Sequence, residues 1–180
     1  SLVNQVSISD TFARRIPATV ELGVLSLLVV LIVAIPIGVL AALRPGSKRE
    51  VTASTLMIIG NSVPEFLTGI ALILVVGLEL GLLPVGGYVS FAEDPIENLK
   101  HMAMPVLAIA LTATTLLMRQ TRSAMINTVS DDYIRTARAK GLRERTVIVR
   151  HALRNALIPV ITVFGFQVGL VFSGAVVTEN

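Results

Sequence analysis

The residues best able to do chemistry in this sequence form a basic segment at positions 133–155, "YIRTARAKGLRERTVIVRHALRN". It carries seven lysine and arginine residues together with His151, against a single acid, Glu144. Clustered positive charge of this kind binds anionic lipid headgroups, nucleic-acid phosphates or a protein partner. The segment is therefore the first candidate for a functional site.

Local sequence signals predict that this segment is folded. Ser130, Asp131 or Asp132 can cap a helix that runs to Lys140, and Gly141 stands where a helix ends with a left-handed residue. A second helix is predicted after it from apolar residues spaced three and four apart, which are Val149, Ala152, Leu153, Ala156 and Leu157. We expect a helix, a glycine turn and a second helix.

Three interpretations of the basic segment remain open. It could only fix membrane orientation and touch anionic lipid, or bind nucleic acid as helix-turn-helix units do, or dock a cytoplasmic protein partner. Nucleic-acid binding is disfavoured because the segment lies between two apolar stretches. A segment used only for orientation would not need a capped helix ended by a glycine, which favours docking.

The sequence predicts no catalytic, metal or nucleotide site in this chain. The glycine pairs in "GLLPVG" (81–86) and "GLVFSG" (169–174) are not followed by Lys-Ser/Thr, so a phosphate-binding P-loop is absent. His101 and His151 stand apart from any carboxylate cluster and are interpreted as surface residues. The sequence contains no cysteine, which excludes disulfides and thiolate metal ligands.

The elements that must position the basic segment are apolar helices. Of the 180 residues 53% are hydrophobic and only 15% charged, and the mean hydropathy is +0.79. Apolar runs of about 18 or more residues indicate membrane-spanning helices, because lipid cannot satisfy free backbone groups. We predict an all-α integral membrane protein with about four spans, at positions 18–43, 51–83, 102–119 and 156–177.

The connections between these spans predict the orientation of the chain. The connection at 44–50 is basic, that at 84–101 is net acidic, and the long connection at 119–155 is strongly basic. Lysine and arginine concentrate in cytoplasmic loops, so the three connections are predicted inside, outside and inside. Arg14 and Arg15 depart mildly from this rule. The basic segment is thus expected at the cytoplasmic face.

One ionisable residue is expected deep in the membrane. Glu65 lies about fourteen residues into the second span, roughly 20 Å from its cytoplasmic end, beside Asn61, Ser62 and the helix-interrupting Pro64. Such a group is by default a functional candidate, so these polar residues could line a translocation path. A hydrogen bond between helices, or a span boundary that leaves Glu65 near the outer interface, is the alternative.

Small residues recur at every fourth position of the last span, at Gly165, Gly169 and Ser173. Small side chains at this spacing let two membrane helices approach closely. We predict a helix-packing face there.

Several stretches of the sequence carry a resemblance to a known family. They are "RIPATVELGVLSLL", "IPIGVLAALRPGS", "SVPEFLTGI", "LPVGGY" and, in the basic segment, "RTARAKGL" with "RHALRNALIPVIT". Together they resemble the permease subunits of binding-protein-dependent ABC importers, in particular the dipeptide, oligopeptide and nickel branch. The basic segment is similar to the cytoplasmic EAA loop of these permeases, with Gly141 at the loop's glycine.

The match to the general EAA pattern has two departures. Arg135, Thr136 and Ala137 stand where that pattern has Glu-Ala-Ala, and Arg154 stands where it has proline. These departures weaken the match to the general EAA pattern, but the resemblance to the dipeptide, oligopeptide and nickel branch is unaffected.

The resemblance implies a bacterial inner-membrane permease of about six spans, of which this sequence would lack the first and the last. It implies that the loop at 119–155 seats on a separate ATPase subunit that uses ATP and Mg, while this chain binds no cofactor. The implied coupling residues are Tyr133, Arg135, Thr136, Ala137, Arg138, Lys140, Gly141 and Arg145. The implied partners are ATP-binding cassette subunits, a second permease subunit expected to be a paralogue, a periplasmic or extracellular substrate-binding protein and the lipid bilayer, without nucleic acid.

The function expected from this resemblance is to form part of a path for peptides or a related small solute, driven by a partner's ATP hydrolysis. Dipeptides, longer peptides, glutathione-like compounds and nickel chelates all remain open as substrates. The alternative is an ion-gradient-driven secondary transporter or channel with a basic cytoplasmic anchor loop. That class would call for paired intramembrane charges and inverted repeats, whereas this sequence shows one deep glutamate, Glu65, and no repeat. A membrane-anchored signalling or nucleic-acid-binding protein is the third class.

Overall fold

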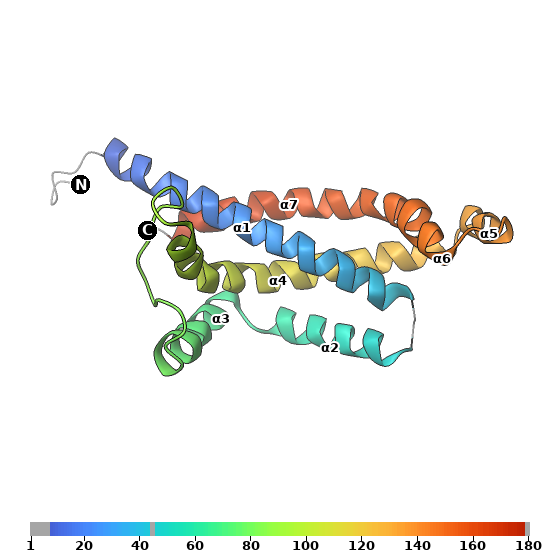
Figure 1. Cartoon of the computed structure of the whole chain (residues 1–180), viewed down its shortest axis with the longest axis horizontal. Helices are drawn as coiled ribbons and strands as arrows, with labels where there is room; N and C mark the ends of the chain where they lie inside the picture. Colours follow the sequence, from blue (N-terminus) through green and yellow to red (C-terminus); the bar gives the residue numbers. More distant parts are fainter. Residues whose placement is uncertain (1–7, 44–45, 179–180) are drawn as a thin grey trace. The chain divides into compact units, whose positions relative to one another are not determined.

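The computed structural model describes residues 8–43 and 46–178, and it describes side chains for all of these except residues 8–15, 49, 57, 61 and 171–178. Every regular element of the described chain is helical, which confirms the expected all-α class. In chain order the elements are α1 (Ile8–Leu43), α2 (Lys48–Ser62), α3 (Glu65–Leu72), η1 (Ile73–Glu79), α4 (Pro95–Val129), α5 (Asp132–Ala139), α6 (Glu144–Thr146), η2 (Val147–Leu153) and α7 (Arg154–Thr178), where η marks a π-helical segment (Figure 1).

Three helical stretches of the described chain are long and apolar enough to cross a membrane. They are Ile16–Leu43, Pro95–Val129 and Glu144–Leu170, and a fourth crossing results if α2 and the α3–η1 pair form one broken span. Large apolar side chains lie open along these helices, with Ile32 70% and Phe166 73% exposed. Apolar surface of this extent belongs in lipid rather than water.

The second apolar stretch is interrupted next to Pro64, as the sequence predicts, because α2 ends at Ser62 and α3 begins at Glu65. Helix α4, by contrast, extends well past the expected 102–119 at both ends. Its C-terminal extension keeps a buried face at helical spacing, formed by Thr121, Ala124, Met125 and Thr128. The first part of the expected long connection is therefore helix.

The described chain divides into two compact units. One consists of Ser1–Leu28, Glu65–Ala110 and Val168–Asn180, and the other of Val29–Pro64 and Leu111–Gln167. We call them the loop unit and the hairpin unit, because the first contains the connection at 80–94 and the second contains the basic segment.

Helix α4 is the central element of the hairpin unit, and two glycines let neighbouring helices approach it closely. A Cβ atom added to Gly38 of α1 would lie 2.7 Å from Thr121 Cβ and 2.8 Å from the backbone oxygen of Met118. A Cβ added to Gly60 of α2 would collide with the Thr115 hydroxyl. At Gly38 a side chain would meet backbone that cannot give way, and at Gly60 it would require the Thr115 hydroxyl to move, so both glycines let their helices lie close against α4.

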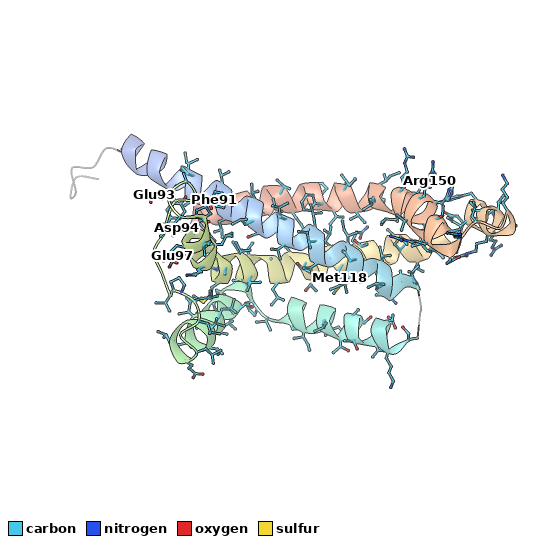
Figure 2. The ribbon with its side chains drawn as sticks, viewed as in Figure 1. Phe91, Glu93, Asp94, Glu97, Met118 and Arg150 are labelled. Atoms are coloured by element: carbon cyan, nitrogen blue, oxygen red, sulfur yellow. The ribbon has the colours of Figure 1, made fainter. Side chains whose placement is uncertain are left out.

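The loop unit is organised around the start of α4. The Asp94 carboxylate accepts hydrogen bonds from the backbone N–H groups of Ile96 (2.9 Å) and Glu97 (3.0 Å), and thereby caps the helix. Asn98 is buried and its side-chain amide donates to the Val89 carbonyl at 2.8 Å, which pins the preceding loop to α4. Figure 2 shows Glu93, Asp94 and Glu97 gathered around this helix start beside Phe91.

A second hydrogen bond ties the same loop to α1. The Tyr88 hydroxyl donates to Glu21 Oε2 at 2.9 Å. Because the donated proton stabilises the contact, and because the nearby carboxylate opposes a phenolate, the pKa of Tyr88 is raised above its ordinary value. Side-chain hydrogen bonds thus hold the connection at 80–94 to both α4 and α1.

Candidate functional site: the basic hairpin

We define the basic hairpin as residues 130–156, and Asp131 is the N-cap of its first helix, α5. This residue has the extended conformation of an N-cap (φ −66°, ψ 149°), and its backbone carbonyl accepts from the N–H groups of Ile134 (3.1 Å) and Arg135 (3.3 Å). Its side chain makes no capping hydrogen bond to the described residues. Helix α5 therefore starts where the sequence predicts, with the cap formed by the backbone alone.

Helix α5 ends in a glycine turn of the Schellman type. Gly141 has the left-handed conformation that its position predicts (φ 76°). Its N–H donates to the Arg138 carbonyl at 2.9 Å, and the N–H of Leu142 donates to the Ala137 carbonyl at 3.4 Å. These bonds satisfy the last carbonyls of α5 and set the direction in which the chain turns back.

An ion pair closes the tip of the hairpin. The Arg138 guanidinium contacts both carboxylate oxygens of Glu144, with Nη2–Oε1 at 2.8 Å and Nε–Oε2 at 3.2 Å. The hydrogen bond to Glu144 raises the pKa of Arg138 above its ordinary value. The Arg138 side chain is 39% exposed, so the pair adds geometry more than stability. The only acid within residues 133–155 thus joins the two arms across Gly141.

The two arms of the hairpin pack together through apolar side chains. Ile134 and Ala137 of α5 are buried, and α5 contacts η2. The opposing buried residues on η2 are Val147, Ile148 and Ala152. Figure 1 shows α5 as a short helix beside the turn that leads into α6. These buried apolar side chains hold the two arms of the hairpin against each other.

A polar contact closes the base of the same hairpin. The side-chain amide of Asn155 donates to the Tyr133 hydroxyl at 2.7 Å, and that hydroxyl in turn donates to the His151 carbonyl at 3.5 Å. The arms are therefore held at the tip by charge, along their length by apolar contact, and at the base by hydrogen bonds.

The structure divides the expected coupling residues into an outward and an inward group. Ala137 is buried against the second arm, so its side chain supports the hairpin rather than facing a partner. The residues that remain exposed are Tyr133, Arg135, Thr136, Arg138, Lys140, Gly141 and Arg145. Arg150, labelled in Figure 2, adds a further exposed cation on η2. The outer surface of the hairpin is consequently basic.

The link between α4 and α5 is short and hydrogen-bonded. Only residues 130 and 131 separate the two helices. The N–H groups of Ser130 and Asp131 donate to the carbonyls of Asn127 and Thr128, both at 3.2 Å, and the Ser130 hydroxyl donates to the Asn127 carbonyl at 2.7 Å. The link therefore leaves few free backbone torsions between α4 and α5.

Two residues of the hairpin were not among the candidates from sequence. Glu144 was noted only as the single acid of the segment, and Asn155 only as its last residue. An acid three residues after a turn glycine, with an arginine three residues before it, is a signal that could have indicated the Arg138–Glu144 pair. No comparable pattern indicates the Tyr133–Asn155 contact, which joins residues 22 positions apart.

The candidate path residues lie at the break between α2 and α3. Ser62 is the last residue of α2, and its hydroxyl donates to the carbonyl of Ile58 at 2.7 Å within its own helix. Glu65 is the first residue of α3 and is exposed; an acid at a helix start is favoured by the helix dipole. The side chain of Asn61 lies outside the described residues. The break thus explains why an acid is tolerated here.

The small-residue face of α7 has no partner in the described part of this chain. A Cβ added to Gly165 or Gly169 would meet no atom within 4 Å, and the side chain of Ser173 lies outside the described residues. The predicted packing at these positions remains a prediction. No group of three or more histidine, cysteine, aspartate or glutamate residues suited to a metal ion occurs among the described residues.

Comparison with known proteins shows the family. Residues 34–180 match the family described as the inner membrane component of binding-protein-dependent transport systems. The chain belongs to this family. It is accordingly a multi-pass inner-membrane permease component, as the resemblance implied. The interpretations as an ion-gradient-driven transporter, a channel or a nucleic-acid-binding protein are set aside.

Curated relatives carry the names of peptide permeases. The chain is 39% identical to the dipeptide transport system permease protein DppB of Escherichia coli strain K12, across 100% of this chain and 60% of that protein. It is 38% identical to the oligopeptide transport system permease protein AppB of Bacillus subtilis strain 168, across 96% of this chain and 55% of the relative. It is 36% identical to the di/tripeptide transport system permease protein DppB of Pseudomonas aeruginosa, across 100% of this chain and 60% of the relative. The chain therefore spans about 55 to 60% of the length of these permeases.

Proposed function

We propose that this chain forms part of the translocation pathway of an ATP-driven importer of peptides, and that its basic hairpin docks a separate ATPase subunit. The proposal is carried by two observations: the arms of the hairpin contact each other at the tip, along their length and at the base, and its outer surface carries exposed basic side chains. In this role ATP and Mg are used by the partner, and the chain itself hydrolyses nothing.

A docking element must transmit displacement without absorbing it. The hairpin suits this requirement because the Arg138–Glu144 pair, the apolar interface and the Tyr133–Asn155 contact connect its two arms at three levels. The two-residue link then connects the hairpin to α4. A loop that served only to set membrane orientation would not require so short a connection. The hairpin can therefore act as a lever on the membrane helices.

Peptides are the proposed cargo because the relatives compared above are named as dipeptide, oligopeptide and di/tripeptide permeases. The proposed partners are two ATPase subunits, a second permease subunit, a substrate-binding protein on the outer side and the surrounding lipid. The break at Pro64 with Glu65 and the open glycine face of α7 are the proposed contributions to the path and to the pairing of permeases.

Co-purification of the whole permease with its ATPase tests the docking role. Arg135→Glu and Lys140→Glu reverse two exposed charges of the hairpin without touching a buried contact, and we expect both to lose most of the bound ATPase. Lys100→Glu is the matched control, since Lys100 is also exposed but lies at the start of α4, paired to Glu97 at 2.8 Å. Retention of stoichiometric ATPase by both hairpin variants would reject the docking role.

A further inference from the structure

One ion pair of the described chain joins residues far apart in sequence. Arg122 Nη2 of α4 lies 2.7 Å from Glu50 Oε1 of α2, across 72 positions. The other ion pairs of the described residues join positions only three to six apart. The Glu50–Arg122 pair is therefore the charged contact that connects separate helices within the hairpin unit.

Glu50 is fixed in place by its neighbours. The hydroxyl of Ser54 donates to the same Oε1 atom at 2.9 Å, and the N–H of Glu50 donates to the Ser47 hydroxyl at 3.3 Å in the N-terminal cap of α2. The carboxylate side chain is only 16% exposed. Any movement imposed on this carboxylate is thus passed to the first turn of α2.

The Arg122 side chain leaves part of its hydrogen-bonding capacity unused. Its side chain is 30% exposed, and its Nε atom is buried with no hydrogen-bond partner among the described residues. A partly desolvated pair with an unused donor is a weak contributor to stability. The position of the pair, rather than its contribution to stability, therefore indicates its role.

That place is on the route from the hairpin into the membrane helices. Arg122 precedes the end of α4 at Val129 by seven residues, about two helical turns. The hydrogen-bonded link at 130–131 joins this end of α4 directly to α5. A displacement of the hairpin therefore reaches Arg122 through a continuous, stiff path.

We propose that Glu50 and Arg122 are a positioning pair that transmits movement of the basic hairpin from α4 to α2. Helix α2 ends at the break before Glu65, so the pair connects the hairpin to the segment that carries the candidate path residues. The inference rests on the proposed docking function and adds to it the contact through which docking acts on α2.

The test uses the whole permease, reconstituted with its ATPase and binding protein, and two readouts. Co-purified ATPase reports docking, and peptide taken up per ATP hydrolysed reports coupling. Glu50→Gln and Arg122→Gln should leave docking at the wild-type level and lower uptake per ATP about tenfold, in the range of contact coupling energies. Exchange of the two charges, Glu50→Arg with Arg122→Glu, should restore a large part of that loss.

The controls separate this inference from the proposal beneath it. Glu97→Gln removes an exposed local pair at the other end of α4 and should change neither readout. Normal uptake per ATP in both single variants would overturn the positioning role, and so would a charge exchange that restores nothing. Loss of assembly in the single and exchanged variants alike would show a purely structural pair and overturn it too. If the wild type itself fails to bind the ATPase, the docking function fails instead.

Discussion

Asn155 and Tyr133 close the base of the basic hairpin, with the asparagine side-chain amide donating to the tyrosine hydroxyl at 2.7 Å. The contact joins the first turn of α5 to the start of α7 across 22 positions. The neighbouring residues Ile134 and Ala156 are buried, so the contact lies at the edge of the hairpin's apolar interface.

Removal of this contact should loosen α5 without unfolding it. Tyr133→Phe keeps the ring and deletes the hydroxyl, and the loss of its exposed hydrogen bonds to Asn155 and His151 costs about 1 kcal/mol. We expect amide hydrogen exchange in α5 to become roughly fivefold faster, as measured by mass spectrometry on the whole permease. Tyr88→Phe, which deletes the other tyrosine hydroxyl of this sequence, should leave exchange in α5 unchanged. Equal rates of amide hydrogen exchange in wild type and Tyr133→Phe would show that the apolar interface alone holds the two arms of the hairpin together.

Substitution of the turn glycine should uncouple transport from ATP hydrolysis. A Cβ at Gly141 meets nothing within 4 Å, so Gly141→Val suffers only from its φ of 76°, which disfavours a side chain by about 1–2 kcal/mol. We expect membrane insertion to persist while binding-protein-stimulated ATPase activity and uptake fall. Gly141→Asn should retain more activity, because asparagine tolerates the left-handed region.

Gly81 supplies the matched control for this prediction. It also has a positive φ (59°) and an open Cβ position, but it lies in the connection at 80–94. Gly81→Val therefore imposes similar backbone strain away from the hairpin. Full uptake and stimulated ATPase activity in Gly141→Val would refute the coupling role of the turn.

The helical architecture and the hairpin could be predicted from sequence because their signals are local. Apolar runs predict membrane helices, Asp131 and Gly141 mark the ends of α5, and Pro64 marks the break between α2 and α3. Each of these depends on conformational preferences within a few residues. The family resemblance rested on the same short stretches.

The contacts between helices could not be predicted in this way. Glu50 and Arg122 lie 72 positions apart, and only the crossing of α2 and α4 brings them together. Likewise, Ala137 was expected at a docking surface, but the rotation of α5 on η2 buries it. Helix rotation and crossing are set by side-chain packing across the whole unit, which no short window contains.

The pKa of Tyr88 predicts a pH dependence for the loop unit. The bond to Glu21 raises this pKa in the folded protein, so the stabilisation it provides is present below the ordinary phenol value of about 10 and is lost as the pH rises through the folded pKa. We expect the phenolate absorbance assigned to Tyr88, taken as the difference between wild type and Tyr88→Phe, to appear only above that ordinary value. Glu21→Gln should shift the titration back down. A Tyr88 titration unaffected by Glu21→Gln would contradict the assignment of the cause.

The close contacts of Gly60 and Gly38 with α4 predict that a second substitution on α4 will rescue an alanine at Gly60 but not one at Gly38. Gly60→Ala places a methyl group against the Thr115 hydroxyl, and overpacking of this kind typically costs about 1–3 kcal/mol. Thr115→Ala removes that hydroxyl and leaves the nearest remaining atom, Thr115 Cβ, at 3.6 Å. The double variant should therefore regain most of the thermal stability that Gly60→Ala loses, as measured by unfolding in detergent.

Gly38→Ala should resist the same repair. Its added methyl group would lie 2.8 Å from the backbone oxygen of Met118, which no side-chain substitution removes, and 2.7 Å from Thr121 Cβ, which Thr121→Ala retains. Gly165→Ala is the control, because its Cβ position is open and alanine favours the helix by about 1 kcal/mol over glycine. Repair of Gly38→Ala by Thr121→Ala would mean that α1 can move away from α4, and that the close crossing does not fix the hairpin unit.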